Sequence, residues 1–584
     1  MKEIKITLLF LMIGIGISAQ EKYAVGMFHF NLQYVAGDYK IENRIIRESL
    51  YPALQFFEKN PAFKSDIEIQ GYAIEVLAEE HPQVLALLKK LVARNQIELV
   101  IAHYSDQFFI GYPALDLQKS IEISDKILAQ HGLKRSGVFF GQEIQWTPAY
   151  ASALKGKYNI IATSSDPHSY YRDRTMPLVN VRYGNDEILG LIGAGAKKLD
   201  GLEWDFAFLD DGEVFNSLDY NSNFYRVPKQ EKESVDRFKK LQSQGYKFVT
   251  ITELVNKIKS LKSYTVPDYQ FVPEGTWNME VCGPYMWMGR QRSGVETDGI
   301  TRALCYQLRS LLLAMEKLVD YAASKGIDVT ELKAKIEEAW RHLLLAEVSD
   351  SSGWTPWPVE VQYTANEVAV GKKLLKEVAD KLKTMLPLGD KTWVLETQTG
   401  RMMPQESLSP KTAKAALLPL PVSVRAEKYT STIKQVGENL YRFDIHCERP
   451  ADGAVEIIFD TAPNGLFYSA GAGEEIAVEI PTDLKHNPAF SLSNGFIYLN
   501  NGYSLVKDCS VEHLAATWKM KEQKLVFREE LNEDNKSMDM RFYLLKGSAD
   551  DGLKLGNRLN TWPSFTVKIQ NNQLVLEKQM PESM

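Results

Sequence analysis

Between residues 23 and 261 the chain alternates short apolar runs with longer amphipathic segments. The run from Tyr23 to Phe30 has the length of a buried strand, whereas Ile41 to Glu58 carries apolar residues at helical spacing. About seven strand and helix units follow one another in this way, which is typical of parallel strands that close into a barrel. The expected strands are 23–30, 67–72, 97–103, 136–140, 159–162, 202–210 and 247–251, and the expected helices are 41–58, 82–95, 116–131, 149–154 and 230–244.

The pattern changes twice after this region. From Gly299 to Met385 the apolar spacing is helical throughout, and it predicts three helices, 301–324, 329–346 and 365–385, which are long enough to form a small bundle. The next segment is rich in proline and polar residues and suits an extended linker. Beyond it, strands follow without intervening helices, which indicates a β-sandwich. These strands are expected at 429–445, 455–460, 475–480, 489–499, 524–529, 541–545 and 565–576.

The predicted fold class is therefore α/β, with a distorted (β/α)₇ barrel and a C-terminal helical bundle, followed by an all-β sandwich domain. The expected divisions are a signal peptide 1–20, the barrel 21–275, the bundle 276–386 that completes the same unit, the linker 387–425 and the sandwich 426–584.

The first 20 residues place Lys2 and Lys5 ahead of an apolar run and end in Ser18-Ala19-Gln20. This order is typical of a secretory signal peptide, and the apolar core is short for a membrane span. We therefore expect export to the periplasm or the extracellular space and no membrane span in the mature chain. An uncleaved N-terminal anchor is the alternative.

The composition limits the classes of molecule that the protein is expected to bind. The chain has 584 residues, a net charge of −7 and no Lys/Arg-rich stripe, so nucleic acid is not an expected partner. Aromatic residues make up 11%, with ten Trp, which permits surfaces that stack on sugars.

The four cysteines, Cys282, Cys305, Cys447 and Cys509, form no metal-type CxxC pair. Export would allow a disulfide, with Cys447 to Cys509 favoured, but free buried thiols are about equally expected. The sequence leaves the oligomeric state open.

Polar side chains gather where the barrel strands are expected to end. In a parallel barrel these carboxyl ends form the active site. Two carboxylates that face each other there can cleave a glycosidic bond, one at the anomeric centre and one protonating the leaving oxygen. A single such carboxylate is more often a solvated loop residue. The candidates are His29 and Asn31, His103 and Asp106, Glu143 and Trp146, and Asp210, Asp211 and Glu213.

Residues 69–77, Glu79-Glu80-His81-Pro82 and 85–100 form one group of motifs, and Leu209-Asp210-Asp211-Gly212-Glu213 forms a second. The first group resembles the early barrel of glycoside hydrolase family 57, and the second is similar to the Asp-x-Glu segment of that family. The family contains amylopullulanases, 4-α-glucanotransferases, branching enzymes and α-galactosidases. Residues 273–277 with 287–289, and residues 339–350 followed by Trp354 and Trp357, resemble its later motifs. The resemblance runs from about Val25 to Met385 and leaves the sandwich out.

The resemblance implies a retaining α-glycosidase or glucanotransferase that needs no cofactor and no metal. It places Glu143 at the nucleophile and Asp211 at the general acid/base, with Asp210 as the fallback, and implies carboxyl groups about 5 to 5.5 Å apart. Acidic neighbours should raise the pKa of Asp211. The carbohydrate substrate would be bound by His29, Asn31, His103, Asp106, Trp146, Glu213, Trp287, Asp350 and Trp354. His29-Phe30-Asn31 replaces the usual His-Gln-Pro, and Phe140 replaces a Trp before Glu143, which leaves the sugar open between α-glucan and α-galactoside.

Two other functions fit part of the pattern. A metal-dependent carbohydrate hydrolase could use Asp210-Asp211 as deacetylases use paired aspartates, or His29, His103 and Asp106 as zinc ligands, near the place of the α-mannosidase His-x-Asp motif. A non-catalytic glycan-binding protein could stack sugars on its tryptophans. Binding alone would not require both Glu143 and the aspartate pair, so catalysis is favoured.

Overall fold

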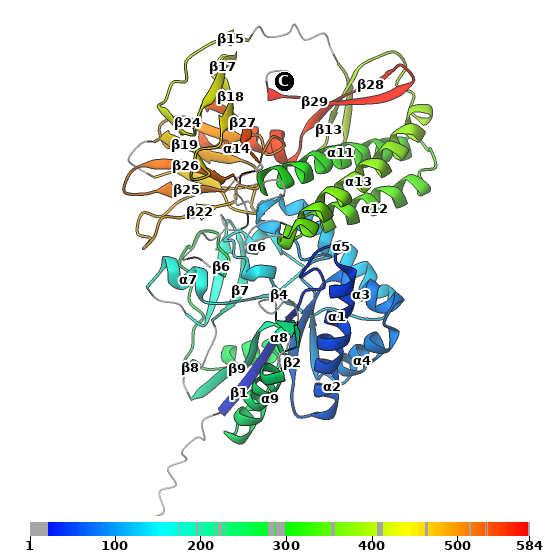
Figure 1. The fold of residues 1–584 in the computed structure, drawn as a ribbon, viewed down its shortest axis with the longest axis vertical. Coiled ribbons are helices and arrows are strands. Elements are labelled where there is room, and N and C mark those ends of the chain that lie inside the picture. The colour runs from blue at the N-terminus through cyan, green and yellow to red at the C-terminus, as the bar shows by residue number, and fades with distance from the viewer. Residues whose placement is uncertain are drawn as a thin grey trace, which may run out of the picture.

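The computed structural model describes residues 21–173, 176–193, 197–199, 201–215, 218–219, 225–226, 228–277, 279, 287, 298–351, 357–405, 413–461, 465–512, 515–531, 533 and 535–581. An α/β part lies at one end of the long axis, and three long helices and a β-rich part lie at the other end (Figure 1). The predicted signal peptide lies outside the described residues. Within them, no helix is long and apolar enough to cross a membrane.

The first sheet of the α/β part is built around β1 (Glu21–Phe30). Parallel to this strand run β2 (Ser65–Ile69), β9 (Leu202–Asp211) and the short β12 (Lys247–Phe248). β3 (Ile97–Val100) extends the sheet beyond β2, and β8 (Lys197–Leu199) pairs antiparallel with β9. Every residue from Tyr23 to Phe30 is buried, as expected of a parallel strand that is covered on both faces.

A second sheet has the order β4-β5-β7-β6. β4 (Val138–Phe140), β5 (Ile160–Thr163) and β7 (Asp186–Ile192) are parallel, and β6 (Leu178–Tyr183) returns antiparallel as the edge strand. Within the described residues no hydrogen-bonded ladder joins β3 to β4, so the strands form two sheets and the predicted closed (β/α)₇ ring is not observed. The α/β class and the separate all-β part are observed.

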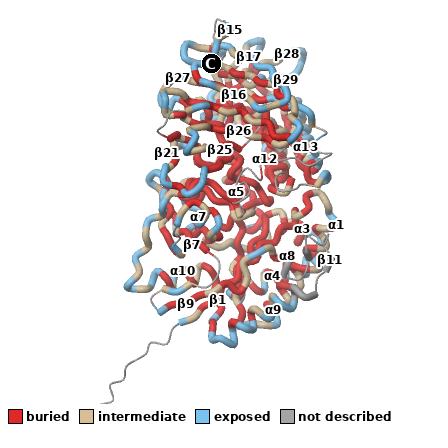
Figure 2. Tube along the Cα trace, turned by 60° about the vertical axis from the view of Figure 1, so that its left-hand side comes forward, coloured by how far each residue is buried: buried red, intermediate tan, exposed pale blue. Residues whose placement is uncertain are grey.

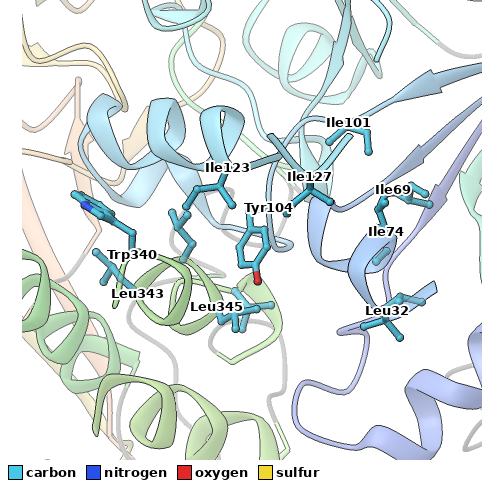
Figure 3. Close-up of a cluster of buried hydrophobic side chains, with 14 of the residues drawn as sticks. Leu32, Ile69, Ile74, Ile101, Tyr104, Ile123, Ile127, Trp340, Leu343 and Leu345 are labelled. Carbon is cyan, nitrogen blue, oxygen red and sulfur yellow. The ribbon is translucent and has the colours of Figure 1, made fainter. Parts of the chain in front are cut away.

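Helices cover these sheets and carry the largest apolar core. Figure 3 shows part of it, where Ile123 and Ile127 lie near Tyr104 and the three residues Trp340, Leu343 and Leu345. The helices of the α/β part are α1 (Tyr39–Ile45), η1 (Ile46–Leu50), α2 (Tyr51–Lys59), α3 (Gly71–Glu79), α4 (Pro82–Ala93), α5 (Ala114–Gln130), α6 (Tyr150–Ala153), α7 (Asp166–Tyr171), α8 (Gly212–Phe215), α9 (Pro228–Ser243) and α10 (Ile251–Lys259). The helix expected at 41–58 is thus one helical stretch with a π-helical turn inside it.

Three long helices pack together as the sequence predicts: α11 (Asp298–Ser324), α12 (Thr330–Ala346) and α13 (Pro358–Met385). α13 begins seven residues earlier than expected. Pro358 occupies its first turn, where proline is tolerated, and Glu360 accepts a hydrogen bond from the Trp357 backbone N–H.

The β-rich part contains an eight-stranded and a five-stranded antiparallel sheet. The first has the order β15 (Lys414–Ala415), β17 (Tyr429–Gly437), β18 (Leu440–Glu448), β27 (Ser537–Lys546), β24 (Tyr503–Lys507), β23 (Phe496–Tyr498), β20 (Phe467–Ser469), β21 (Ala477–Glu479). The second has the order β16 (Val422–Arg425), β19 (Ala454–Asp460), β26 (Lys524–Glu530), β25 (Ala516–Lys519), β22 (Ala489–Phe490).

The segment 387–425, expected as an extended linker, is part of the sheets. β13 (Trp393–Glu396) and β14 (Arg401–Pro404) form a third sheet with the last strands, β28 (Ser564–Gln570) and β29 (Gln573–Lys578), and β29 packs near α13. Two more strands of this segment, β15 and β16, enter the two large sheets. Proline and polar residues are common at edge strands and turns as well as in linkers, so the composition of this segment does not distinguish the two.

Buried residues run without a break from the α/β part into the β-rich part (Figure 2). One apolar cluster contains Phe139 and Trp146 from the former together with Ala470 and Phe542 from the latter. The described cysteines, Cys305, Cys447 and Cys509, are buried free thiols, so the favoured disulfide between Cys447 and Cys509 is not formed, and Cys282 lies outside the described residues.

Candidate functional site

The parallel pairing of β1 with β9 places His29 beside Asp211 and Phe28 beside Asp210. Register partners point to the same face of a sheet, and successive residues point to opposite faces. Asp211 therefore faces the site with His29, whereas Asp210 is exposed. Burial and the charge of Asp210 raise the pKa of Asp211 to about 6, although His29 opposes this. The geometry thus separates the two aspartates that the sequence left ambiguous.

His29 lies between two carboxylates. Its Nδ1 is hydrogen-bonded to Glu68, its register partner on β2, and its Nε2 is 3.9 Å from Asp106 Oδ1. Burial alone would lower the pKa of His29, but the Glu68 and Asp106 carboxylates outweigh it, so this pKa lies well above its usual value. His29 is therefore an imidazolium at neutral pH.

Asn31 joins three elements at the end of β1. Its backbone N–H donates to Glu213 Oε1 on α8 over 2.7 Å, and its Nδ2 donates to Asp350 Oδ2 over 2.8 Å. Asp350 lies on a single turn, η6 (Ser349–Ser351), that follows α12. Burial is the main cause that raises the pKa of Asp350 to about 7, and the charge of Asp211 adds to it. The bundle thus supplies one carboxylate of the site.

Glu143 follows β4 on a tight turn, η3 (Gln142–Ile144). The φ angles of Glu143, 55°, and Ile144, 52°, lie in the left-handed region. For a residue other than glycine this conformation costs about 1–3 kcal/mol, and such residues cluster at functional sites. Trp277 Nε1 donates to Glu143 Oε2, and Gln142 Nε2 donates to Oε1 over 3.2 Å. Strain and two donors therefore fix this carboxylate.

The carboxylates of Glu143, Asp211 and Asp350 act on one another. Burial raises the pKa of Glu143 well above its usual value, and the charges of Asp350 and Asp211 raise it further, while Trp277 and His29 lower it. Tyr34 belongs to the same group, because burial and the charges of Asp211, Glu213, Asp350 and Glu143 together raise its pKa. These side chains converge on one space at the strand ends.

Two of these residues, Tyr34 and Glu68, were not found in the sequence, and Trp277 was found there only as part of the motif 273–277 and as one of the tryptophans. Glu68 is a carboxylate inside the fully buried strand Ser65–Ile69, and a charge in such a run is a signal that can be read. Tyr34 and Trp277 lie in irregular segments, where no period indicates the direction of a side chain.

Some residues that were expected to contact the sugar are buried in the interior of the protein instead. Trp146 is fully buried with Nε1 donating to Val272 O over 3.2 Å, and Trp287 is 3% exposed with Nε1 donating to Thr276 Oγ1 over 3.3 Å, so both are core residues. His103 is buried between Phe109 and Phe139, and burial lowers its pKa to about 3, so it is neutral. Trp354 lies outside the described residues.

One group of side chains could hold a cation. Ligand atoms of His29, Glu68 and Asp106 lie within 4.8 Å of one another, and all three residues are buried. His29 Nε2, Glu68 Oε1 and both Asp106 carboxylate oxygens have no hydrogen-bond partner there. One imidazole and two carboxylates form a donor set that suits zinc. The predicted set with His103 is corrected, since Glu68 takes its place in this group.

Comparison with known proteins finds a family model that matches part of the chain and solved structures with a similar fold. The model of the family described as Glycosyl hydrolase family 57 matches residues 21–231. An alpha-amylase from Pyrococcus horikoshii is 26% identical over 115 residues, which cover 20% of this chain and 18% of that protein. A 4-alpha-glucanotransferase from Thermococcus litoralis is 26% identical over 107 residues, 18% of this chain and 16% of that protein. The match thus spans less than a fifth of either relative.

Among solved structures, an alpha-mannosidase from Enterococcus faecalis V583 is similar with a TM-score of 0.58. The two share 8% sequence identity over 90% of this chain and 87% of that one. At this identity the likeness shows a common fold and nothing more.

Proposed function

We propose that the protein is a glycoside hydrolase or transferase that acts on an α-linked carbohydrate with retention of configuration, on the premise that residues 21–231 match the model of glycosyl hydrolase family 57. The names of the relatives favour an α-glucan over an α-galactoside. The observation that carries the proposal is the convergence of Glu143 and Asp211, two carboxylates on different strand ends whose surroundings shift both pKa values.

In this mechanism Asp211 donates its proton to the glycosidic oxygen while Glu143 attacks the anomeric carbon and forms a glycosyl ester. The ionised Asp211 then takes a proton from water or from an acceptor hydroxyl, which displaces Glu143. Glu143 must be ionised at the start. Protonation of Asp211 and Asp350 removes two of the charges that raise its pKa, and the Trp277 donor favours its charged form.

Unpartnered polar atoms around the carboxylates offer contacts for sugar hydroxyls. Asn31 Oδ1, Glu213 Oε2 and His29 Nε2 are buried and have no hydrogen-bond partner. A buried polar atom without a partner costs about 1–3 kcal/mol, which a bound hydroxyl group would offset. We assign these three residues and Asp350 to the reacting sugar.

The test is to incubate the protein with α-glucans and with α-linked glucosides and galactosides, and to follow the first anomer formed by NMR. We expect the retained anomer. Glu143→Gln should lower kcat/KM by roughly 10³-fold or more. Asp211→Asn should lose turnover of natural glycosides but still release the aryl alcohol in a first-turnover burst from aryl glycosides with acidic leaving groups, which need no protonation, and its second step should be slow because the base is lost.

Asp210→Asn is the matched control, because it changes the neighbouring carboxylate on the other face of β9, and we expect its activity within a few-fold of the unmodified protein. An inverted product, or an unchanged Glu143→Gln, would remove Glu143 from the nucleophile role. Tight sugar binding without turnover in the unmodified protein would favour the glycan-binding alternative.

A metal-dependent hydrolase is the second candidate, and the buried donors of His29, Glu68 and Asp106 favour it. A divalent cation held there would polarise sugar hydroxyls as a Lewis acid. Elemental analysis of the purified protein, with Glu68→Gln beside it, tests this. A stoichiometric metal that Glu68→Gln loses, with activity abolished by chelators, would replace the metal-free proposal; metal-free active protein would exclude this second candidate.

We also propose that the chain is exported, since its first 20 residues have the order of a signal peptide. The N-terminal sequence of the protein recovered from periplasm or medium tests it, and we expect a mature start at Gln20 or Glu21.

A further inference from the structure

Glu274 is a buried carboxylate whose partners all come from the β-rich part. Gly471 N donates to its Oε1, and Ser491 donates to its Oε2 through N over 2.8 Å and through Oγ over 3.3 Å. Gly471 follows β20 and Ser491 follows β22. A Cβ at Gly471 would lie 2.5 Å from Glu274 Oε1, so the close approach requires glycine. Glu274 thus fixes two loops of the β-rich part to the α/β part.

The residues directly after Glu274 run antiparallel to the loop of Glu143. Trp146 N donates to Gly275 O over 2.8 Å, and Gly275 N donates to Trp146 O over 3.1 Å. Two residues further, Trp277 N donates to Glu143 O over 3.3 Å while its indole donates to the Glu143 carboxylate. The segment 274–277 therefore holds both the backbone and the carboxylate of Glu143.

The same β-rich loop also holds the far end of the Glu143 loop. Thr147 Oγ1 donates to Gly471 O over 2.7 Å, so Gly471 bonds Glu274 through its N–H and Thr147 through its carbonyl. The left-handed backbone of Glu143 is bonded directly by Trp277 and lies four residues before Thr147. A strained conformation persists where the surrounding structure holds it from several sides.

We propose that Glu274 is a positioning residue for Glu143, and that the β-rich part, through Gly471 and Ser491, completes the active site by holding the 274–277 segment and the Glu143 loop in register. The part that sequence analysis set aside as a separate sandwich is thus required for the geometry of catalysis. This inference rests on the proposed function only for the role of Glu143.

The first test is Glu274→Gln. An amide has one acceptor oxygen and one donor nitrogen, so its NH₂ must face a backbone N–H of either Gly471 or Ser491, and at least one contact is lost. We expect kcat to fall about 10- to 100-fold with KM nearly unchanged, because a displaced reacting group affects the chemical step. Ser491→Ala removes the 3.3 Å hydroxyl contact to Glu274 and the 2.7 Å bond to Ile110 O but keeps the backbone N–H that Glu274 accepts from; it is the matched mild control and should stay near the unmodified protein.

The pH profile distinguishes positioning from a general loss of structure. The Trp277 donor lowers the pKa of Glu143, so its displacement in Glu274→Gln should move the acidic limb of kcat/KM to higher pH, as Trp277→Phe should. If both variants act through the same hydrogen bond, the double variant is no worse than Trp277→Phe alone. Additive losses with an unmoved acidic limb would overturn the inference.

A readout without turnover separates this inference from the proposed function. The indole N–H resonance of Trp277, assigned by its loss in Trp277→Phe, should shift in Glu274→Gln toward its position in Glu143→Gln. An unchanged resonance would overturn the inference even if Glu143 proves catalytic, and the shift would support it even if Glu143→Gln keeps turnover. Should Glu274→Gln fail to fold, Thr147→Val removes the second attachment with little change in volume and is expected to give the same shift in the acidic limb.

Discussion

Asp210 and Asp211 are adjacent in sequence and differ in the face of β9 that each occupies. The sequence predicted His29, Asn31, Glu143, Asp211 and Glu213 at the ends of barrel strands, and the resemblance implied Asp350 beside them; the structure brings all six together. The sequence could not distinguish core tryptophans from sugar-stacking ones, because a tryptophan in a loop is not part of a periodic pattern that would show which way its side chain points. Trp146 and Trp287 are therefore the expectations that failed at this scale.

The first prediction concerns the protonation of Asp211. As the acid, it works only when protonated, and its pKa is about 6. We expect kcat/KM on a natural glycoside to fall tenfold per pH unit above that value. In Asp211→Asn, assayed on an aryl glycoside with an acidic leaving group, this alkaline limb should vanish. An alkaline limb that persists in Asp211→Asn would assign the acid role to another group.

Elements with a strong local period were predicted well, and those that depend on a distant partner were not. α5, α11 and α12 appear within a few residues of their expected bounds, since a long amphipathic stripe defines them locally. β13 becomes a strand because β28, far away in sequence, pairs with it, and the short run Trp393–Glu396 carries no such information. The two-sheet arrangement was missed for the same reason: the pairing of strand edges is not a property of a single strand.

Arg309 ties these elements together and gives the second prediction. It lies on α11, and its Nε is 2.8 Å from both Asp116 oxygens on α5, while its Nη1 donates to the carbonyls of Asn560 and Thr561. Both charged side chains are fully buried. Arg309→Met should lower the free energy of unfolding by about 3–5 kcal/mol, because it leaves the Asp116 charge buried and unpaired.

Urea denaturation measures this loss. Arg309→Lys, which keeps the charge without the planar fork, should fall between the two proteins, and Lys317→Met on the same helix is the control, with a change within about 0.5 kcal/mol. Equal midpoints for Arg309→Met and the unmodified protein would show that the pair contributes nothing.

At the scale of the whole molecule, the apolar core that joins the α/β part to the β-rich part argues against independent domains. The domain boundary expected at 426 has no counterpart in this core, because β13 pairs with β28 near the end of the chain and β14 pairs with β13. The predicted order of an α/β part, helices and an all-β part is observed. What the sequence did not reveal is that these parts share one interior.

That interior contains carboxyl groups whose pKa burial raises, and this leads to the third prediction. The pKa is about 7 for Glu42, Asp350 and Glu474. In the unfolded chain such groups titrate near pH 4. The native state therefore binds more protons between about pH 4 and 7, so its stability falls as pH rises through that window.

We expect the thermal midpoint to be higher at pH 5.5 than at pH 8. Glu42→Gln, which is remote from the described active-site carboxylates, should reduce the dependence of the thermal midpoint on pH. Asp390→Asn, which removes an exposed carboxylate, should not. A midpoint that rises between pH 5.5 and 8 would contradict these shifts.

The position of β1 at the centre of the first sheet has a consequence for how the chain is made. Residues Glu21–Phe30 are the first described segment to leave the ribosome, yet their partners are β2, β9 and β12, the last at Lys247–Phe248. Until β9 has been synthesised, one edge of an apolar strand has no pairing partner, and such edges promote aggregation. Nascent chains halted before Leu202 should therefore bind chaperones more strongly than nascent chains halted after Phe248.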